Sequence, residues 1–205
     1  MQNRCVTVVA GVSASGKSTF GVRYVLNAAH LAYRFIFDAD LQYCKRLCCD
    51  SAGDDLDMAV QLIQGTVVFN PHVLYPGRLT DAFAFFCQFA FEHSQRLPGR
   101  KLLLVDEAWK YVSAQRYPQE LANCVQTGRH HGLECMFLSQ LPHKLNEAIR
   151  NECSELVCFR LGDANPLKWA QEKGLNPTEL SALPRLHFVA RNLDSGDELR
   201  GKLEL

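Results

Sequence analysis

The chain has 205 residues, with 22 basic and 22 acidic side chains and no net charge. Without a global positive field, a nucleic-acid partner would have to be held by local clusters of Lys and Arg. The length suffices for one well-buried α/β domain, and no Pro/Gly/Ser-rich linker or charge block divides the chain, so we expect a single domain over residues 1–205.

Apolar, β-branched runs of strand length recur along the chain, at residues 5–10, 32–38, 66–69, 101–106, 135–139 and 156–161. Most of them precede a helical stretch, and their near-continuous hydrophobicity is typical of parallel strands buried on both faces. Further helices are expected over 119–130, 166–173 and 177–183. The tail from His187 onward alternates about the turn signal Asp194-Ser195-Gly196-Asp197, which predicts a terminal β-hairpin at the sheet edge.

Two composition features bear on the cell compartment. The longest apolar stretch, residues 82–91, is half as long as a spanning helix and lies between Asp81 and Glu92, so we expect a core helix and no transmembrane segment. Nine cysteines, an odd number with no leader before them, predict reduced thiols in a cytosolic compartment. The one cluster, Cys44, Cys48 and Cys49, lacks a partner pair for a metal, and buried apolar thiols are expected there.

The first strand runs directly into "GVSASGKST", which fits the pattern GxxxxGK[ST] with a strand before it and a helix after it. Gly11 and Gly16 let backbone N–H groups turn inward around phosphate oxygens, Lys17 reaches the β- and γ-phosphates, and the Ser18 hydroxyl binds Mg²⁺. The alternative is a glycine-rich turn without a ligand. The predicted ATP-binding residues are Gly11, Val12, Ser13, Ala14, Ser15, Gly16, Lys17, Ser18 and Thr19.

The second motif, "KLLLVDEAWK", brings a strand up to Asp106 and Glu107. Asp106 is expected to hold Mg²⁺ through water, and Glu107 to polarise an attacking water. By itself the pair could be a solvated acid pair after a strand. Together with the P-loop it indicates ATP hydrolysis. A small-molecule kinase is the alternative, but the adjacent glutamate favours water as nucleophile over a substrate hydroxyl, and the sequence shows no arginine-rich lid of the kind that small kinases close over the phosphates.

The stretch "TGRHHGLECMFLSQ" contains two further candidates. Gln140 ends a strand of the parallel sheet, so it is expected beside the nucleotide, where its amide can contact the γ-phosphate or the attacking water. Arg129 precedes the same strand and is poorly placed for its own site, but it could enter a neighbour's site in a ring. The plain alternatives are a strand-end amide bonded to backbone and a solvated arginine at a helix C-terminus.

In order and spacing, "GVSASGKST", "LLLVDEAW" and "GRHHGLECMFLSQ" resemble the FtsK/HerA superfamily of P-loop translocases, closest to the genome-packaging ATPases of membrane-containing icosahedral viruses. The resemblance covers about residues 5–161. It implies a three-layer, RecA/ASCE-like P-loop fold, ATP and Mg²⁺ as cofactors, Arg129 as a trans finger and Gln140 as a γ-phosphate sensor. It also implies a homo-oligomeric ring, commonly a hexamer, that moves double-stranded DNA.

Several points depart from the family pattern or stay open. The chain lacks the extra domains of FtsK, so a capsid-vertex or membrane protein would have to serve as docking partner, in the host cytoplasm or with the virion. No basic pore loop stands out; the candidates are Lys110, Arg116 and the group Arg96, Arg100 and Lys101. Reserve candidates for a second trans contact are Arg150 and Arg160. The alternative function is that of a nucleotide-gated assembly or secretion ATPase that does not pump DNA. Such a protein would have the same nucleotide motifs, so these motifs leave the alternative open.

The remaining candidates near these motifs have structural interpretations. His130 and His131 are neighbours on a helix, where side chains diverge, so no shared metal site is expected. Trp109 is expected to pack against the sheet or a neighbouring subunit.

Overall fold

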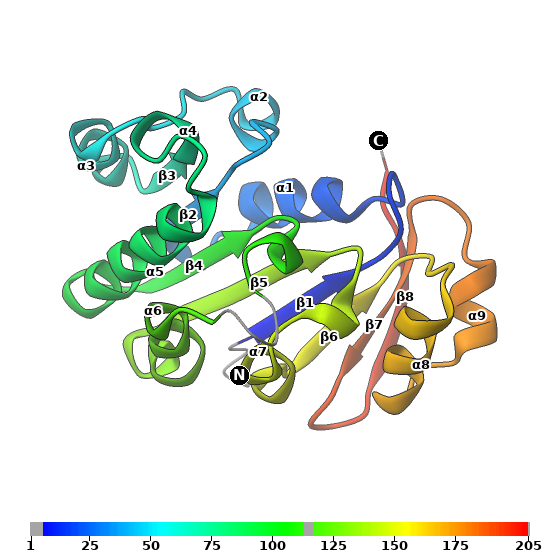
Figure 1. Cartoon of the computed structure of the whole chain (residues 1–205). Coiled ribbons are helices and arrows are strands. Elements are labelled where there is room, and N and C mark those ends of the chain that lie inside the picture. The colour runs from blue at the N-terminus through cyan, green and yellow to red at the C-terminus, as the bar shows by residue number, and fades with distance from the viewer. Residues whose placement is uncertain (1–5, 113–116, 205) are drawn as a thin grey trace.

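The structure of the protein is a computed structural model that describes residues 6–112 and 117–204. Its centre is an eight-stranded sheet in the order β3-β2-β4-β5-β1-β6-β7-β8, with helices on both faces (Figure 1). The strands are β1 Val6–Ala10, β2 Leu31–Phe37, β3 Thr66–Phe69, β4 Arg100–Val105, β5 Leu133–Ser139, β6 Glu155–Cys158, β7 His187–Asn192 and β8 Glu198–Lys202. The first six strands pair in parallel, whereas β7 and β8 pair antiparallel. The predicted mainly parallel sheet with a C-terminal hairpin is confirmed.

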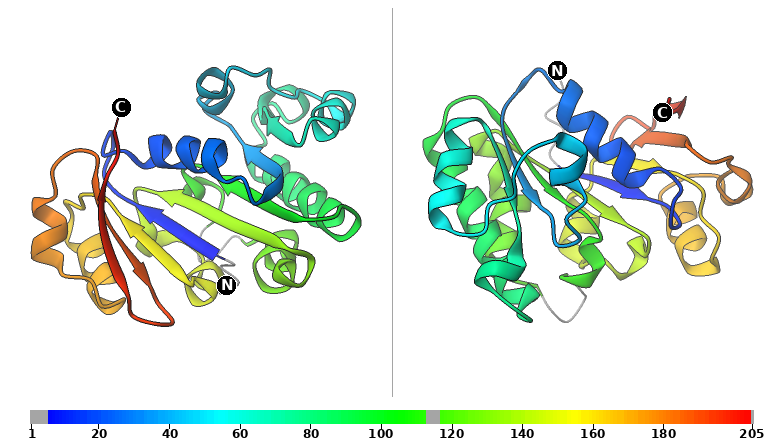
Figure 2. Two further views of the ribbon diagram at one scale, coloured as in Figure 1. Left: turned by 180° about the vertical axis from the view of Figure 1, so that it is seen from behind. Right: turned by 90° about the horizontal axis from the view of Figure 1, so that it is seen from above.

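Helices cover the sheet on both sides, as the two further views in Figure 2 also show. They are α1 Lys17–Asn27, α2 Tyr43–Leu47, α3 Asp55–Ile63, α4 Pro71–Leu74, α5 Leu79–Arg96, α6 Gln119–Ala122, α7 Glu147–Glu152, α8 Ala164–Glu172 and α9 Pro177–Ala182. Helix α1 packs Val22 and Val25 on one face, and α5 packs Phe83 and Phe86 on the other. The apolar stretch 82–91 is therefore part of a core helix, as expected. Within the described residues, no helix is long and apolar enough to cross a membrane.

Strands with apolar side chains on both faces explain the two cores. In β2, Phe35 and Phe37 point into the core under α5, while Ile36 points into the core under α1. Phe37 packs against the rings of Phe69, Phe83, Phe86 and Tyr111, with centroids 5.0–6.1 Å apart. Such burial of alternate residues on opposite faces fixes the register of the parallel strands.

The helix expected over 119–130 is present as a continuous helical stretch over 119–131, but its winding changes from α6 to a π-helical segment Asn123–Thr127 and a 3₁₀ turn Gly128–His131. Gly132 then takes a left-handed φ of 71° and ends the turn before β5. One local prediction is wrong: Cys48 and Cys49 are exposed, not buried, because they follow α2 at the surface. The described residues hold no group of three or more His, Cys, Asp or Glu side chains that could bind a metal ion.

Candidate functional site

The P-loop, residues 11–19, joins β1 to the first turn of α1. Gly16 has a φ of 127°, and a Cβ there would lie 2.9 Å from Phe159 Cε1, so the loop needs glycine at this position. The Lys17 side chain is buried, and its Nζ donates to the Val12 carbonyl at 3.1 Å. Burial lowers the Lys17 pKa, while the Glu107 and Asp106 carboxylates oppose that shift. The P-loop thus wraps around the Lys17 ammonium group, which has the carboxylates of Glu107 and Asp106 close by.

Ser18 and Asp106 meet at the edge of the sheet where the P-loop begins. The Ser18 hydroxyl donates to Asp106 Oδ2 at 2.7 Å. Burial raises the Asp106 pKa, against the lowering effect of the Ser18 hydrogen bond. A hydroxyl and a carboxylate oxygen side by side are hard ligands of the type that Mg²⁺ prefers. The donor set at this point therefore fits Mg²⁺.

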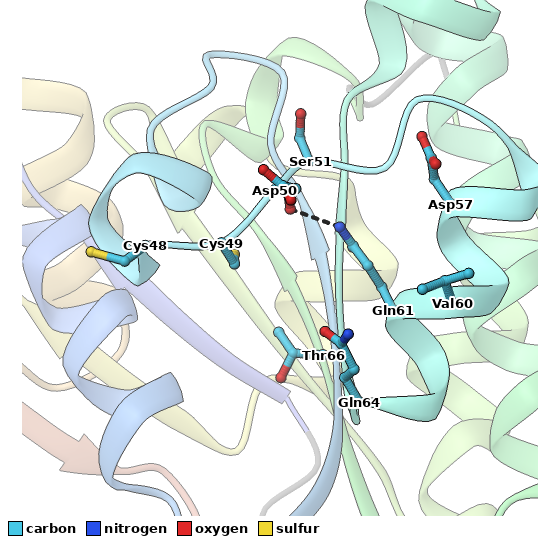
Figure 3. A pocket seen from close by; sticks show the side chains of 9 residues that line it. All are labelled: Cys48, Cys49, Asp50, Ser51, Asp57, Val60, Gln61, Gln64 and Thr66. Carbon is cyan, nitrogen blue, oxygen red and sulfur yellow. Dashed lines mark hydrogen bonds between the residues drawn. The ribbon is translucent and has the colours of Figure 1, made fainter.

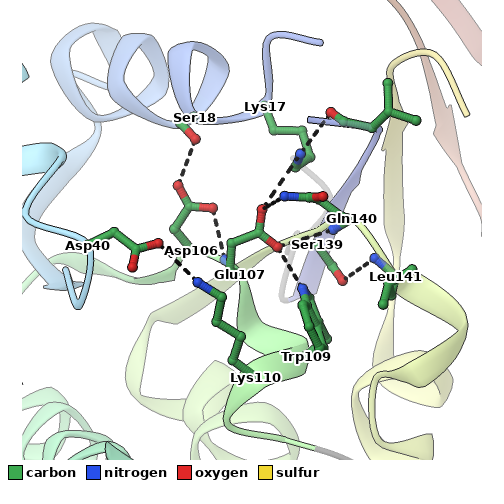
Figure 4. Close-up of polar contacts among 11 residues, drawn as sticks. Lys17, Ser18, Asp40, Asp106, Glu107, Trp109, Lys110, Ser139, Gln140 and Leu141 are labelled. Atoms are coloured by element: carbon green, nitrogen blue, oxygen red, sulfur yellow. Dashed lines mark hydrogen bonds and ion pairs between the residues drawn. The ribbon is translucent and has the colours of Figure 1, made fainter. Parts of the chain in front are cut away.

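Glu107 lies at the centre of the polar contacts drawn in Figure 4. Its Oε2 accepts from Trp109 Nε1 at 2.7 Å, and its Oε1 accepts from Gln140 Nε2 at 2.7 Å. The Lys17 Nζ lies 3.8 Å from the same Oε1. Glu107 takes a left-handed backbone conformation, φ 48° and ψ 43°, which a non-glycine residue adopts only when its surroundings impose it. The strained turn aims this carboxylate at Lys17 and Gln140.

The order of the strands explains why Gln140 reaches Glu107. Strand β5 lies between β4, which ends before Asp106, and β1, which leads into the P-loop. All three run parallel, so their carboxyl ends meet at one edge of the sheet. Gln140 follows β5 directly and thus lies beside Glu107, to which its side-chain amide donates at 2.7 Å. The structure brings together Lys17, Ser18, Asp106, Glu107 and Gln140, all predicted from the motifs.

Arg129 lies at the opposite end of β5. The strand has seven residues, so at roughly 3.3 Å per residue its two ends are about 20 Å apart. Arg129 is exposed on the 3₁₀ turn before β5 and lines a hollow of about 420 Å³ with residues 151–154 and Asp194. Arg129 therefore does not share a site with its own Lys17.

The reserve and pore candidates occupy different places. Arg160 is exposed beside the P-loop of its own chain, where its carbonyl accepts the Val12 N–H at 2.9 Å. Arg150 is half-buried in α7. Lys101 is buried and donates to the His131 carbonyl at 2.9 Å, so it is wrong as a pore candidate.

The other basic candidates are largely tied to carboxylates. Arg100 forms an ion pair with Glu134 at 2.6 Å, and Lys110 forms one with Asp40 at 3.2 Å. Arg96 is exposed at the end of α5, and Arg116 lies outside the described residues.

Trp109 has a role that the sequence did not indicate. It packs against the core, as expected, but its indole N–H also holds Glu107. His131 packs edge-to-face on Phe91, with ring centroids 5.9 Å apart. The motif "LLLVDEAW" contains this tryptophan, but the sequence alone does not indicate its hydrogen bond to Glu107.

Two hollows of the structure differ in charge. The smaller one, about 170 Å³, is lined by Ala14, Gly16, Lys17, Ser18, Thr19, Arg46, Arg185 and Leu186. The larger one, about 630 Å³, lies at the β3 edge and is lined by Asp50 and Asp57 but by no Lys or Arg (Figure 3). Phosphate groups would be repelled by the larger hollow and attracted by the smaller one. Sequence motifs gave no indication of Arg46 or Arg185.

No protein-family model and no curated protein sequence matches the chain. Among solved structures, the genome packaging NTPase B204 from Sulfolobus turreted icosahedral virus 2, in complex with ATP-gammaS, is similar over 100% of both chains, with 23% identity and a TM-score of 0.79. VirB4 of Thermoanaerobacter pseudethanolicus is similar over 98% of this chain and 89% of that one, with 13% identity and a TM-score of 0.73.

A third similar protein is EccC, a type VII secretion ATPase. Thermomonospora curvata EccC (ATPases 2 and 3), in complex with a signal sequence peptide, matches 98% of this chain and 37% of that one, with 13% identity and a TM-score of 0.62. At such identities the comparison concerns the fold. The chain has the α/β fold of these P-loop ATPase structures.

Proposed function

We propose that the protein is an ATPase with a single P-loop domain over residues 1–205. The observation that carries this is the position of Glu107, whose carboxylate lies 3.8 Å from Lys17 and 2.7 Å from the Gln140 amide. Backbone N–H groups of the P-loop would bind the β- and γ-phosphates, and Lys17 would neutralise their charge. Glu107 would take a proton from a water molecule as that water attacks the γ-phosphorus, with ADP as leaving group.

The metal requirement follows from Ser18 and Asp106. These two residues would hold Mg²⁺, directly or through water, at their paired oxygens. When bound there, Mg²⁺ neutralises charge on the phosphates. Gln140 would exchange its contact with Glu107 for one with the γ-phosphate or the attacking water, so that Glu107 is released when ATP is in place.

We propose further that hydrolysis drives double-stranded DNA through a homo-oligomeric ring, in genome packaging. The support is the full-length likeness to B204, a genome packaging NTPase, together with the motifs of the FtsK/HerA type. The hexamer is the ring we expect, working in the host cytoplasm or on the virion with a capsid-vertex or membrane protein. Between Arg46 and Arg78 the chain has no Lys or Arg and has Asp50, Asp54, Asp55 and Asp57, so the DNA would not pass over α3.

Arg129 fits this ring as a residue that acts in trans. It is exposed and lies about 20 Å from its own Gln140, by the length of β5 at roughly 3.3 Å per residue. An arginine inserted into a neighbour's site would stabilise the charge that develops on the γ-phosphate, an effect worth roughly 10³ to 10⁵ in turnover in P-loop enzymes.

The experiment compares ATP hydrolysis with and without double-stranded DNA over a range of salt concentrations. Stimulation by DNA that falls steeply with salt, and its loss in Lys17→Ala, is the expected result. Hydrolysis that DNA does not change at any salt concentration would argue against the motor.

The likeness to EccC keeps a second function in view, that of a secretion or assembly ATPase. EccC shares the fold at 13% identity, so the fold alone does not separate the two functions. Stimulation of hydrolysis by a membrane or coat protein, with no response to DNA, would favour this second function.

A further inference from the structure

Two arginines outside every motif reach the P-loop from opposite sides. Arg46 and Arg185 line the hollow of about 170 Å³ whose other walls are Ala14, Gly16, Lys17, Ser18, Thr19 and Leu186. We propose that these two arginines bind, in cis, the phosphates of ATP and ADP that are nearest the nucleoside. This inference rests on the proposed nucleotide site and names two residues that complete it.

Arg46 is held in place by the capping of α2. The buried Asp38 accepts hydrogen bonds from the backbone N–H groups of Gln42, Tyr43 and Cys44, at 2.8, 2.8 and 3.1 Å. A carboxylate at this position fixes the first turn of a helix. The fully buried Tyr43 ring then packs α2 against α1, where a Cβ on Gly21 would lie 2.6 Å from its hydroxyl. Arg46, one turn further, donates from Nη1 to Thr19 Oγ1 at 3.4 Å.

Arg185 is held from the other side, by the turn between α9 and β7. The next residue, Leu186, donates its N–H to the Ser15 carbonyl of the P-loop at 3.0 Å, and its own carbonyl accepts the Leu203 N–H at 2.9 Å. Leu186 has a left-handed φ of 67°, a conformation that costs a leucine energy and is maintained by these two hydrogen bonds. The chain thus anchors the base of Arg185 to the P-loop itself.

Neither guanidinium has a carboxylate partner in the part of the chain that the structure describes, and no acidic residue lines the hollow. Two cations that converge without a counter-charge on backbone N–H groups at the start of a helix make an anion site. Both side chains are exposed, so they are free to close on a ligand.

The position of the hollow identifies the phosphates. Glu107 and Gln140 mark the end where the γ-phosphate would react, and neither lines this hollow. Thr19, which Arg46 contacts, follows Ser18 on the helix, beyond the residue that would hold the metal at the β- and γ-phosphates. The two arginines therefore act on the nucleoside side, which ADP and ATP share, whereas Arg129 would act on the γ-phosphate of a neighbour.

Isothermal titration of the full chain with ADP and with ATPγS tests this inference. Arg46→Gln and Arg185→Gln should each raise the Kd for both nucleotides about ten-fold, and the double variant about 100-fold, as expected for lost charge-assisted hydrogen bonds. Arg23→Gln is the matched control, because Arg23 lies on α1 but does not line the hollow, and its Kd should equal that of the wild type. Unchanged melting temperatures would show that the exposed substitutions leave the fold intact.

Three results would overturn the inference, and one would overturn the nucleotide site. Wild-type affinity in the double variant would remove both arginines from the site. A loss of ATPγS binding with normal ADP binding would assign them to the γ-phosphate. Normal nucleotide affinity with weakened DNA binding would make them a DNA surface. If the wild type and Arg23→Gln bound neither nucleotide, the proposed ATP site would itself be wrong.

Discussion

The contact between Gln140 and Glu107 gives a sharp test of the proposed chemistry. In Gln140→Leu the hydrogen bond from Nε2 to Glu107 Oε1, 2.7 Å long, is lost while the volume of the side chain is nearly kept. A hydrogen bond to a charged group is worth about 1.5–3 kcal/mol, and each 1.4 kcal/mol corresponds to a factor of ten. If the amide passes from Glu107 to the γ-phosphate or water during the reaction, kcat should fall about 10- to 100-fold, while ATP affinity changes by less than about three-fold.

Single-turnover phosphate release measures the chemical step, and titration with ATPγS measures binding. The matched control is Gln88→Leu, because Gln88 Nε2 also donates to a glutamate, Glu92 Oε1 at 2.9 Å, but on the exposed face of α5 far from the P-loop. That variant should hydrolyse ATP at the wild-type rate. Wild-type turnover in Gln140→Leu would refute the role of Gln140. Faster turnover would refute it as well, since the amide would then only restrain Glu107.

Three further predictions concern the base, the ring and the core. Glu107→Gln should keep ATP binding and lower kcat about 10²- to 10⁴-fold, the range for general base catalysis, and equal turnover would remove Glu107 from the mechanism. Arg129→Ala and Glu107→Gln subunits, each inactive alone, should regain hydrolysis when mixed, because some interfaces then pair an intact Glu107 with an intact Arg129; inactive mixtures that form rings would exclude the trans role. Phe37→Ala should lower the free energy of unfolding by about 3–5 kcal/mol in denaturant titrations, because Phe37 is fully buried among four aromatic rings, and a loss below about 1 kcal/mol would show that the core collapses around the gap.

The parallel sheet could be predicted because its strands are short, apolar runs separated by helices. The P-loop and the pair Asp106 and Glu107 could be predicted for a similar reason: each is a local pattern whose residue types match one chemistry. Predicting the position of Gln140 also required the rule that the carboxyl ends of parallel strands meet at one edge of the sheet. The strand order β4-β5-β1 places Gln140 at that edge.

Other features depend on contacts that no local pattern encodes. The hydrogen bond from Trp109 to Glu107 accompanies a left-handed backbone at Glu107, which the sequence Asp-Glu-Ala-Trp does not indicate. Arg46 and Arg185 are 139 positions apart and meet only because the sheet brings α2 and the α9–β7 turn to the two sides of the P-loop. The change of helix winding over 119–131 is likewise not encoded in a local pattern; this segment packs beside α5 and β5.

Strand β5 gives the proposed ring a physical link between neighbouring sites. All seven of its residues are buried, and it is hydrogen-bonded to β4 on one side and β1 on the other. A strand held in this way moves as a rigid element, because a close-packed interior cannot absorb a shift at one end. Arg129 precedes this strand and Gln140 follows it. In the proposed ring, a neighbour that drew Arg129 toward its own γ-phosphate would pull on the element that positions Gln140 against Glu107, and hydrolysis in one subunit would then be sensed at the active site of the next.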